Sequence, residues 1–259
     1  PYASLLFGDT ADETLARARK ALADGFSAVK FGWGPIGTLD AAFDADHFVA
    51  AREGIGNDGH LMVDVGQIFV EDIEAAAARL PALEQARAHW LEEPFSGHAF
   101  EAYADLAARS PNVGIAGGEA AHNIAMARHL MDFGKVKFVQ IDCGRIGGIG
   151  PAFEVAQLAQ VRGVTYVNHT FTTHLALSAS LQPFAGIADD RICEYPVDPS
   201  ALALAVVANP ITRNPAGEVF APDAPGLGVK VDTDALKPYL VDAEIKVGGK
   251  VIYATPSLG

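Results

Sequence analysis

Short apolar runs alternate with longer segments of helical period along most of the chain, and this alternation limits the fold more than any other feature. It is typical of parallel strands that are connected by crossover helices. Eight strands are predicted near residues 4–8, 28–32, 60–65, 88–92, 113–119, 136–142, 164–169 and 191–195. Seven helices are predicted between them, over residues 10–24, 44–56, 71–87, 99–109, 123–133, 151–162 and 173–185.

Six ionisable residues share one position in this pattern, because each stands at the carboxyl end of a predicted strand. They are Asp64, Glu92, Glu119, Asp142, His169 and Glu194, and their mean spacing of about 26 residues is roughly one strand–helix unit. The ends of the strands meet at one mouth in a closed barrel, whereas an open doubly wound sheet would place them along an edge. Their convergence favours a barrel of the (β/α)7β type.

After Tyr195 the composition changes to a sequence rich in Pro, Gly and Ala, with turn signals such as Asn209-Pro210 and Pro225-Gly226. We therefore expect a catalytic barrel over residues 1–200 and a C-terminal extension over residues 201–259. The extension is expected to pack against the barrel or a capping domain. Near its end, residues 245–247 and 250–253 flank Gly248-Gly249 and predict a hairpin.

Charge and composition argue against several classes of partner. The 19 basic and 32 acidic residues give a net charge of −13, which repels phosphate backbones and anionic lipid, so we expect no nucleic acid and no membrane partner. The longest apolar run, residues 201–208, is too short to span a bilayer. No secretory signal is visible at Pro1, and Cys143 and Cys193 read as reduced thiols, which favours a cytoplasmic location.

Three carboxylates at the ends of consecutive strands suggest a metal site. Asp64, Glu92 and Glu119 offer only oxygen ligands, which suit Mg²⁺ better than zinc. Repulsion among them could instead be relieved by basic side chains, but only Lys30 obviously occupies the same end of the barrel. One lysine does not balance these acids together with Asp142 and Glu194.

His169 and Asp142 end neighbouring strands, where a carboxylate can orient an imidazole and raise its basicity. A single histidine at a strand end is more often a structural residue. The carboxylate triad nearby favours the alternative, a general-base dyad. None of the other seven histidines combines such a position with such a partner.

This ordered set of motifs resembles the barrel domain of the enolase superfamily, in the group similar to mandelate racemase. The motifs are Val63-Asp64, Trp90-Leu91-Glu92-Glu93-Pro94, Gly118-Glu119, Asp142-Cys-Gly-Arg-Ile-Gly-Gly, Asn168-His169 and Glu194. Glu-Glu-Pro alone is a weak signal, whereas the whole set at near-constant spacing is specific. The resemblance covers nearly the whole chain and implies a barrel of eight strands and seven helices.

The resemblance also implies a role for each site residue. Mg²⁺ would be bound by Asp64, Glu92 and Glu119, His169 with Asp142 would form the base dyad, Glu194 would hydrogen-bond the substrate carboxylate, and Lys30 would match the first lysine of a Lys-x-Lys motif. Strand alternation supports Glu92 rather than Glu93 as the ligand, because neighbouring residues of a strand face opposite sides.

Three departures from the family's pattern restrict the reaction. Gly32 stands where the second lysine of the motif, the base for the opposite face, is expected. Gly66 replaces a polar residue that commonly contacts substrate. The family's N-terminal capping domain is absent from these residues.

We therefore expect a Mg²⁺-dependent hydro-lyase that abstracts the proton α to the carboxylate of a sugar acid and eliminates the β-hydroxyl to give a 2-keto-3-deoxy acid. One alternative is a racemase or epimerase of a 2-hydroxy acid, with Lys30 or a water as second base. Another is a non-catalytic, metal-stabilised barrel subunit. The acidic, partly apolar surface also permits a homo-oligomer.

Overall fold

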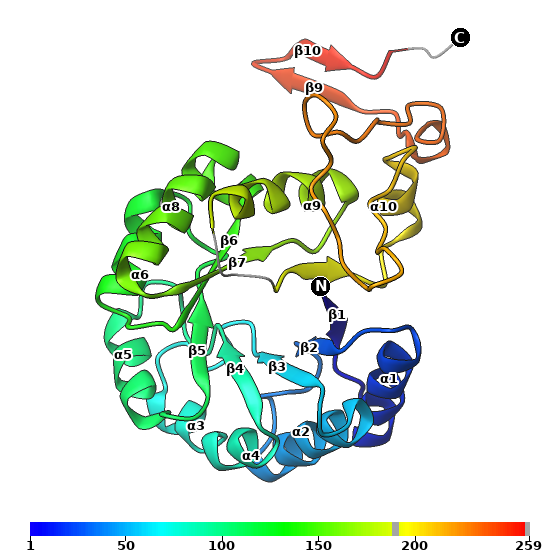
Figure 1. The fold of residues 1–259 in the computed structure, drawn as a ribbon. Coiled ribbons are helices and arrows are strands. Elements are labelled where there is room, and N and C mark those ends of the chain that lie inside the picture. The colour runs from blue at the N-terminus through cyan, green and yellow to red at the C-terminus, as the bar shows by residue number, and fades with distance from the viewer. Residues whose placement is uncertain (188–191, 257–259) are drawn as a thin grey trace.

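The computed structural model describes residues 1–187 and 192–256, and most of them form a ring of parallel strands surrounded by helices (Figure 1). The strands are β1 Tyr2–Leu6, β2 Ala28–Gly32, β3 His60–Asp64, β4 Ala88–Glu92, β5 Gly114–Gly117, β6 Phe138–Asp142, β7 Thr165–His169 and β8 Glu194–Pro196. They lie in the order β7-β6-β5-β4-β3-β2-β1-β8. Because β8 returns to pair with β1, the sheet curls into a nearly closed barrel, as the sequence predicts.

The seam between β7 and β8 is bridged by a side chain. Asn168 of β7 accepts a hydrogen bond from the backbone N–H of Glu194 at 2.8 Å and donates one to the carbonyl of Glu194 at 3.4 Å. The amide group therefore takes the place of a backbone partner where the barrel closes, and it fixes Glu194 beside the end of β7.

Helices form the outer layer of the barrel. They are α1 Ala11–Ala23, α2 Ala41–Ile55, α3 Ile73–Ala77, α4 Leu80–Gln85, α5 Phe100–Arg109, α6 Ile124–Asp132, α7 Cys143–Ile146, α8 Ile149–Arg162 and α9 His174–Leu181, with a 3-10 turn over Gln182–Gly186. Side chains of Thr10, Asp40, Asn123 and Thr173 accept hydrogen bonds from the first turns of α1, α2, α6 and α9. These caps stabilise helix starts close to the predicted positions.

The buried core of the described residues has two parts within the barrel, and a third small cluster of Leu177, Leu181, Cys193 and Ile211 joins α9 to the start of the C-terminal extension. The larger lies between strands and helices, and the smaller fills the barrel interior with side chains that include Tyr2, Met62, Trp90, Phe138 and Val167. Several of these residues stand two positions before a polar residue of the mouth, on the same face of their strand. The interior cluster is therefore an apolar floor below the ionisable residues.

Several predicted boundaries were wrong, and each has a local cause. The helix predicted over 71–87 is divided into α3 and α4, since Pro81 fits the first turn of a helix but not its interior. Strand β5 ends at Gly117, because Gly118 turns the chain at a φ of 125°, so Glu119 lies two residues beyond the strand. Strand β8 begins at Glu194 rather than ending there, in register with Tyr2 of β1, and Arg191 lies outside the described residues.

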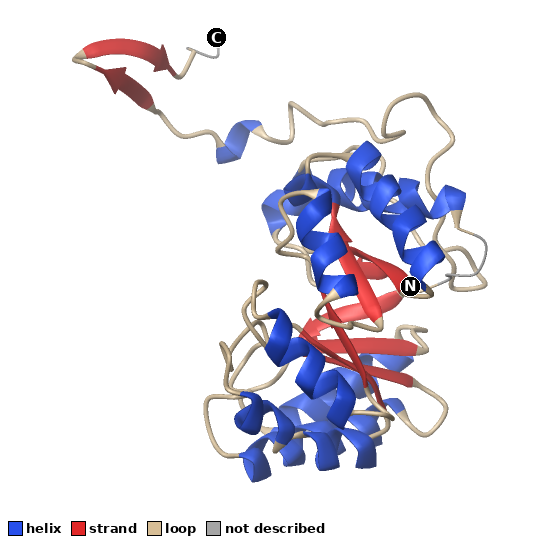
Figure 2. Cartoon of the chain, turned by 90° about the vertical axis from the view of Figure 1, so that its left-hand side faces the viewer, coloured by secondary structure: helices blue, strands red, loops and turns tan. Residues whose placement is uncertain are grey.

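The C-terminal extension leaves the barrel and ends in a hairpin that projects from the rest of the chain (Figure 2). It contains α10 Ala201–Ala205, which the sequence did not predict, and the antiparallel strands β9 Glu244–Val247 and β10 Lys250–Ala254, which confirm the predicted hairpin. Every residue of the two hairpin strands is exposed. Among the described residues, no helix is long and apolar enough to cross a membrane.

Candidate active site

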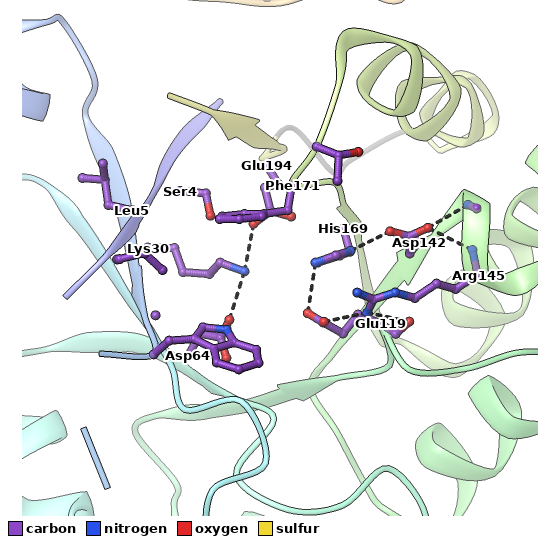
Figure 3. Close-up of a pocket in the computed structure, with 15 residues that line it drawn as sticks. Ser4, Leu5, Lys30, Asp64, Glu119, Asp142, Arg145, His169, Phe171 and Glu194 are labelled. Atoms are coloured by element: carbon purple, nitrogen blue, oxygen red, sulfur yellow. Dashed lines mark hydrogen bonds and ion pairs between the residues drawn. The ribbon is translucent and has the colours of Figure 1, made fainter. Parts of the chain in front are cut away.

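A cavity of about 420 Å³ opens at the carboxyl ends of the barrel strands (Figure 3). Its walls include six of the seven residues singled out from the sequence: Lys30, Asp64, Glu119, Asp142, His169 and Glu194. The seventh, Glu92, is wholly buried, with its carboxylate against Lys30. The fold therefore brings all seven together, although they are spread over more than 160 positions of the sequence.

The three predicted metal ligands lie close together. Asp64, Glu92 and Glu119 each offer a carboxylate oxygen, and these atoms are within 4.8 Å of one another. Protein donors hold all three side chains: Asp64 Oδ1 accepts from the N–H of Gly66 at 2.9 Å, Glu92 Oε2 from Trp90 Nε1 at 2.9 Å, and Glu119 Oε1 from Arg145 Nη1 at 2.7 Å. Each carboxylate retains lone pairs for a cation.

Lys30 lies at the centre of a buried group of acids that we call the lysine cluster: Lys30, Asp64, Glu92 and Glu194. Its Nζ is 2.6 Å from Glu92 Oε1, 2.9 Å from Glu194 Oε1 and 3.6 Å from Asp64 Oδ2. The side chains of the cluster are at most 8% exposed. Three carboxylates thus share one ammonium group, away from water.

The charge balance of the lysine cluster suits a divalent cation. Burial raises the pKa of Asp64 well above its ordinary value, and the neighbouring charge of Glu92 adds to this effect. Burial also raises the pKa of Glu92, although Lys30 opposes the shift. Two negative charges remain in excess when all four groups are ionised, so the oxygen donors of Asp64, Glu92 and Glu119 fit Mg²⁺ in number, type and charge.

Across the cavity lies a second group, the histidine cluster: His169, Asp142, Glu119 and Arg145. Nδ1 of His169 is 2.8 Å from Asp142 Oδ2, as expected for residues that end adjacent strands in register. Nε2 of His169 is 3.2 Å from Glu119 Oε2 and lies toward the cavity. Asp142 Oδ1 accepts from the N–H groups of Gly144 and Arg145, so this carboxylate also caps α7.

The electrostatics of the histidine cluster favour a proton on His169. Burial alone would lower the pKa of the imidazole, but Glu194, Asp142 and Glu119 outweigh burial and raise the pKa to about 9. For Asp142, burial favours the neutral acid, yet its hydrogen bond with His169 keeps the pKa below the ordinary value. The pair therefore exists as imidazolium and carboxylate at neutral pH in this structure.

Arg145 is a site residue that the sequence did not single out. Its Nη1 is 2.7 Å from Glu119 Oε1, and it lines the cavity. Lys30 is therefore not the only cation at this end of the barrel, which corrects the expectation from the sequence. The sequence does indicate this position, because Arg145 stands three residues after Asp142, within the first turn of a helix that follows a strand end.

The glycines at positions 32 and 66 both border the cavity. A Cβ at Gly32 would lie 3.2 Å from Asp64 Oδ2, on the same inward face of β2 as Lys30. Gly66 has a φ of 52°, and a Cβ there would lie 3.0 Å from the indole of Trp33. Glu93 follows β4 and binds Gln67 Nε2 through Oε2 at 2.8 Å, and it is not a member of the carboxylate triad.

This chain is similar to a cycloisomerase, a dehydratase and a solved structure. D-galactarolactone cycloisomerase of Agrobacterium fabrum is 29% identical over 241 residues, which are 89% of this chain and 61% of that protein. L-talarate/galactarate dehydratase of Salmonella typhimurium is 31% identical over 67% of this chain and 43% of its own length. A solved structure from Rhodobacter sphaeroides, described as a predicted mandelate racemase, is 65% identical with a TM-score of 0.91, covering 99% of this chain and 66% of that one.

The chain spans about three fifths of the length of the first of these relatives. Its residues 13–235 match the model of a family described as enolase C-terminal domain-like. The matched range contains all eight residues of the lysine cluster and the histidine cluster. The chain therefore belongs to the enolase C-terminal domain-like family.

Proposed function

We propose that this chain is the catalytic barrel of a Mg²⁺-dependent acid-sugar dehydratase. One observation carries the proposal: the His169–Asp142 pair lines one cavity together with Asp64 and Glu119, and the buried Glu92 completes a carboxylate triad with these two acids. The relative named L-talarate/galactarate dehydratase, and a second relative named D-galactonate dehydratase, of Klebsiella pneumoniae and 28% identical over 88% of this chain, support the choice of a sugar acid as substrate. Residues 1–200 would form the barrel unit and residues 201–259 the extension.

The substrate carboxylate would lie against the lysine cluster. Asp64, Glu92 and Glu119 would hold Mg²⁺, which would supply positive charge to stabilise the negative charge that develops on the substrate carboxylate. Lys30 adds a second positive charge at the same end of the cavity. Glu194, whose Oε2 accepts from the N–H of Thr170 at 2.6 Å, would donate a hydrogen bond to the substrate carboxylate only when Glu194 itself carries a proton.

His169 would move the proton. Glu194, Asp142 and Glu119 together raise the pKa of His169 to about 9, so a cation bound at Glu119 would oppose part of that shift and favour a neutral Nε2 that accepts the α-proton while Asp142 holds Nδ1. The proton then passes from Nε2 to the β-hydroxyl, which leaves as water as its C–O bond breaks. The resulting enol gains a proton at the β-carbon and loses the proton of its α-hydroxyl, which gives the 2-keto-3-deoxy acid, so atoms and charges balance.

Racemisation has less support, because it needs a second acid–base group on the opposite face of the α-carbon. Gly32 offers none, and the Nζ of Lys30 is surrounded by three carboxylates that keep it charged. Burial opposes that charge, but Glu194 and Glu92 outweigh burial and raise the pKa of Lys30 well above its ordinary value.

The experiment is a product assay with the full-length protein and Mg²⁺. D-galactonate, L-rhamnonate and galactarate are incubated with wild type and with His169→Asn, and 2-keto acid is measured. We expect wild type to convert at least one acid and His169→Asn to lose about 10²–10⁴-fold in kcat. His129→Asn, on the outer helix α6, is the matched control and keeps the wild-type rate. Equal turnover by His169→Asn and wild type would contradict the proposal.

A further inference from the structure

Four large apolar side chains line the cavity and take no part in the proton transfer described above. They are Trp33, which is 60% exposed, Phe171, which is 52% exposed, Leu5 and Leu6. Large apolar side chains with this much exposed surface in a cavity are typical of a binding surface that awaits a ligand.

Trp33 is held in an unusual conformation. Its φ of 56° lies in the left-handed region, which a tryptophan rarely adopts. Its backbone N–H donates to the backbone carbonyl of Asp64 at 3.2 Å. The indole lies against Gly66, where a Cβ would approach Cε2 of Trp33 to 3.0 Å. Glycine at position 66 thus makes room for the indole, and strained backbone of this kind tends to occur at functional sites.

The loop after Trp33 is anchored from below. Both oxygens of Asp44 accept from the N–H of Gly37 at 3.1 Å, and Arg79 Nε donates to Asp44 Oδ2 at 2.8 Å. Arg79 Nη2 also donates to the carbonyl of Leu39 at 2.8 Å. Because Asp44 and Arg79 are both buried, the loop that carries Trp33 is held in place before any ligand binds.

The position of Trp33 relative to the base follows from the strand order. Trp33 and Gly66 follow β2 and β3, and His169 ends β7, which is four strands from β3 along the sheet. In a barrel of eight strands, that separation places β3 and β7 on opposite sides. Gly66 and Trp33 therefore lie on the side of the barrel mouth that faces His169. The indole of Trp33 can donate a hydrogen bond, but it cannot act as a base at neutral pH.

We propose that Trp33 is a specificity-determining residue: its indole packs against the C–H face of a sugar acid that carries a single carboxylate. This inference rests on the proposed function and adds the substrate class. Among the described residues that line the cavity, the cations are Lys30, Arg145 and the protonated His169, and each already lies against carboxylates of the protein. A second substrate carboxylate packed against Trp33 would thus have no free cationic partner from this barrel.

The test compares two acids that differ only at the far carbon: D-galactonate ends in a hydroxymethyl group and galactarate in a carboxylate. Their Kd values are measured by calorimetry on the full-length His169→Asn protein with Mg²⁺, so that no turnover occurs. We expect D-galactonate to bind about tenfold more tightly than galactarate. Adding Trp33→Ala should weaken the binding of D-galactonate about tenfold and leave the Kd of galactarate nearly unchanged. Trp33→Phe should instead keep most of the preference for D-galactonate.

The matched control is Phe133→Ala, which removes an aromatic side chain that is also 60% exposed but lies outside the cavity. It should leave both Kd values unchanged. Equal binding of the two acids, or equal weakening of both by Trp33→Ala, would overturn the proposal.

The binding measurements on the Trp33 variants and the product assay can fail independently of each other. If wild type converts no acid but D-galactonate still binds in a Trp33-dependent way, the dehydratase proposal fails and the role of Trp33 stands. If an acid is converted while Trp33→Ala leaves its KM and kcat unchanged, the role of Trp33 fails and the dehydratase proposal stands. If neither acid binds, the role of Trp33 as their binding surface is also refuted.

Discussion

The lysine cluster and the histidine cluster face the same cavity, yet they differ in burial and in charge balance. Lys30 and its three acids are at most 8% exposed and carry an excess of negative charge. In the histidine cluster, Asp142 is 19% and Arg145 is 45% exposed, and two acids meet two cations when His169 is protonated. The first arrangement is suited to holding a cation, and the second is suited to exchanging a proton with substrate and solvent.

The largest expected effect concerns the cation. Removing Mg²⁺ with EDTA should abolish activity, and added Mg²⁺ should restore it. Glu92→Gln should weaken Mg²⁺ binding by at least about 100-fold, because it removes a negative charge from the ligand set. The affinity is measured by calorimetry on the full-length protein.

Glu93→Gln is the matched control, since Glu93 is also buried and is the next residue along the chain. It should change Mg²⁺ affinity by less than about tenfold. An equal loss in Glu92→Gln and Glu93→Gln would show that the triad was assigned to the wrong member of the pair. Full turnover in metal-free buffer would contradict the cation-holding role of the lysine cluster.

The next effect is on stability. Lys30→Met leaves three buried carboxylates without their ammonium partner, and we expect a loss of about 3 kcal/mol in the free energy of unfolding, measured by urea denaturation in EDTA. Lys20→Met removes a lysine whose side chain is 74% exposed and should leave the unfolding midpoint unchanged. Equal midpoints for Lys30→Met and wild type would show that the lysine cluster is not an ionic group.

The smallest expected effect lies in the histidine cluster. Asp142→Asn keeps the acceptor oxygen that caps α7 but removes the charge beside His169, so kcat should fall about 10–100-fold while the thermal midpoint stays near wild type. Asp132→Asn, at the end of α6, is the control and keeps the wild-type rate. A wild-type kcat for Asp142→Asn would remove this carboxylate from the mechanism.

The parts of the site that the sequence predicts are those that strand periodicity controls. Asp64, Glu92, Asp142 and His169 each end a strand, so the alternation of apolar runs places them at one mouth. Arg145 and Trp33 were missed because both lie just after strand ends, where their directions depend on turns. Arg145 points to Glu119 only because α7 begins at Cys143, and Trp33 reaches Gly66 only through its left-handed φ.

The same limit applies to the fold. Hydrophobic periodicity predicted the order of strands and helices, but not the division of the helix at Pro81 or the start of β8 at Glu194. The bridge from Asn168 to Glu194 also could not be predicted, because it depends on the register in which the barrel closes. Contacts across a closing seam depend on the whole sheet rather than on local sequence.

The central claim is that His169 alone transfers the proton, from one face of the substrate. It is tested by incubating the full-length wild type and His169→Asn with D-galactonate, L-rhamnonate or galactarate and Mg²⁺ in deuterated water, and following the acid by NMR. We expect that wild type forms a 2-keto-3-deoxy acid, that recovered substrate keeps its α-configuration, and that His169→Asn gives neither product nor exchange of the α-proton. An α-epimer without keto acid, or α-proton exchange in His169→Asn, would contradict it.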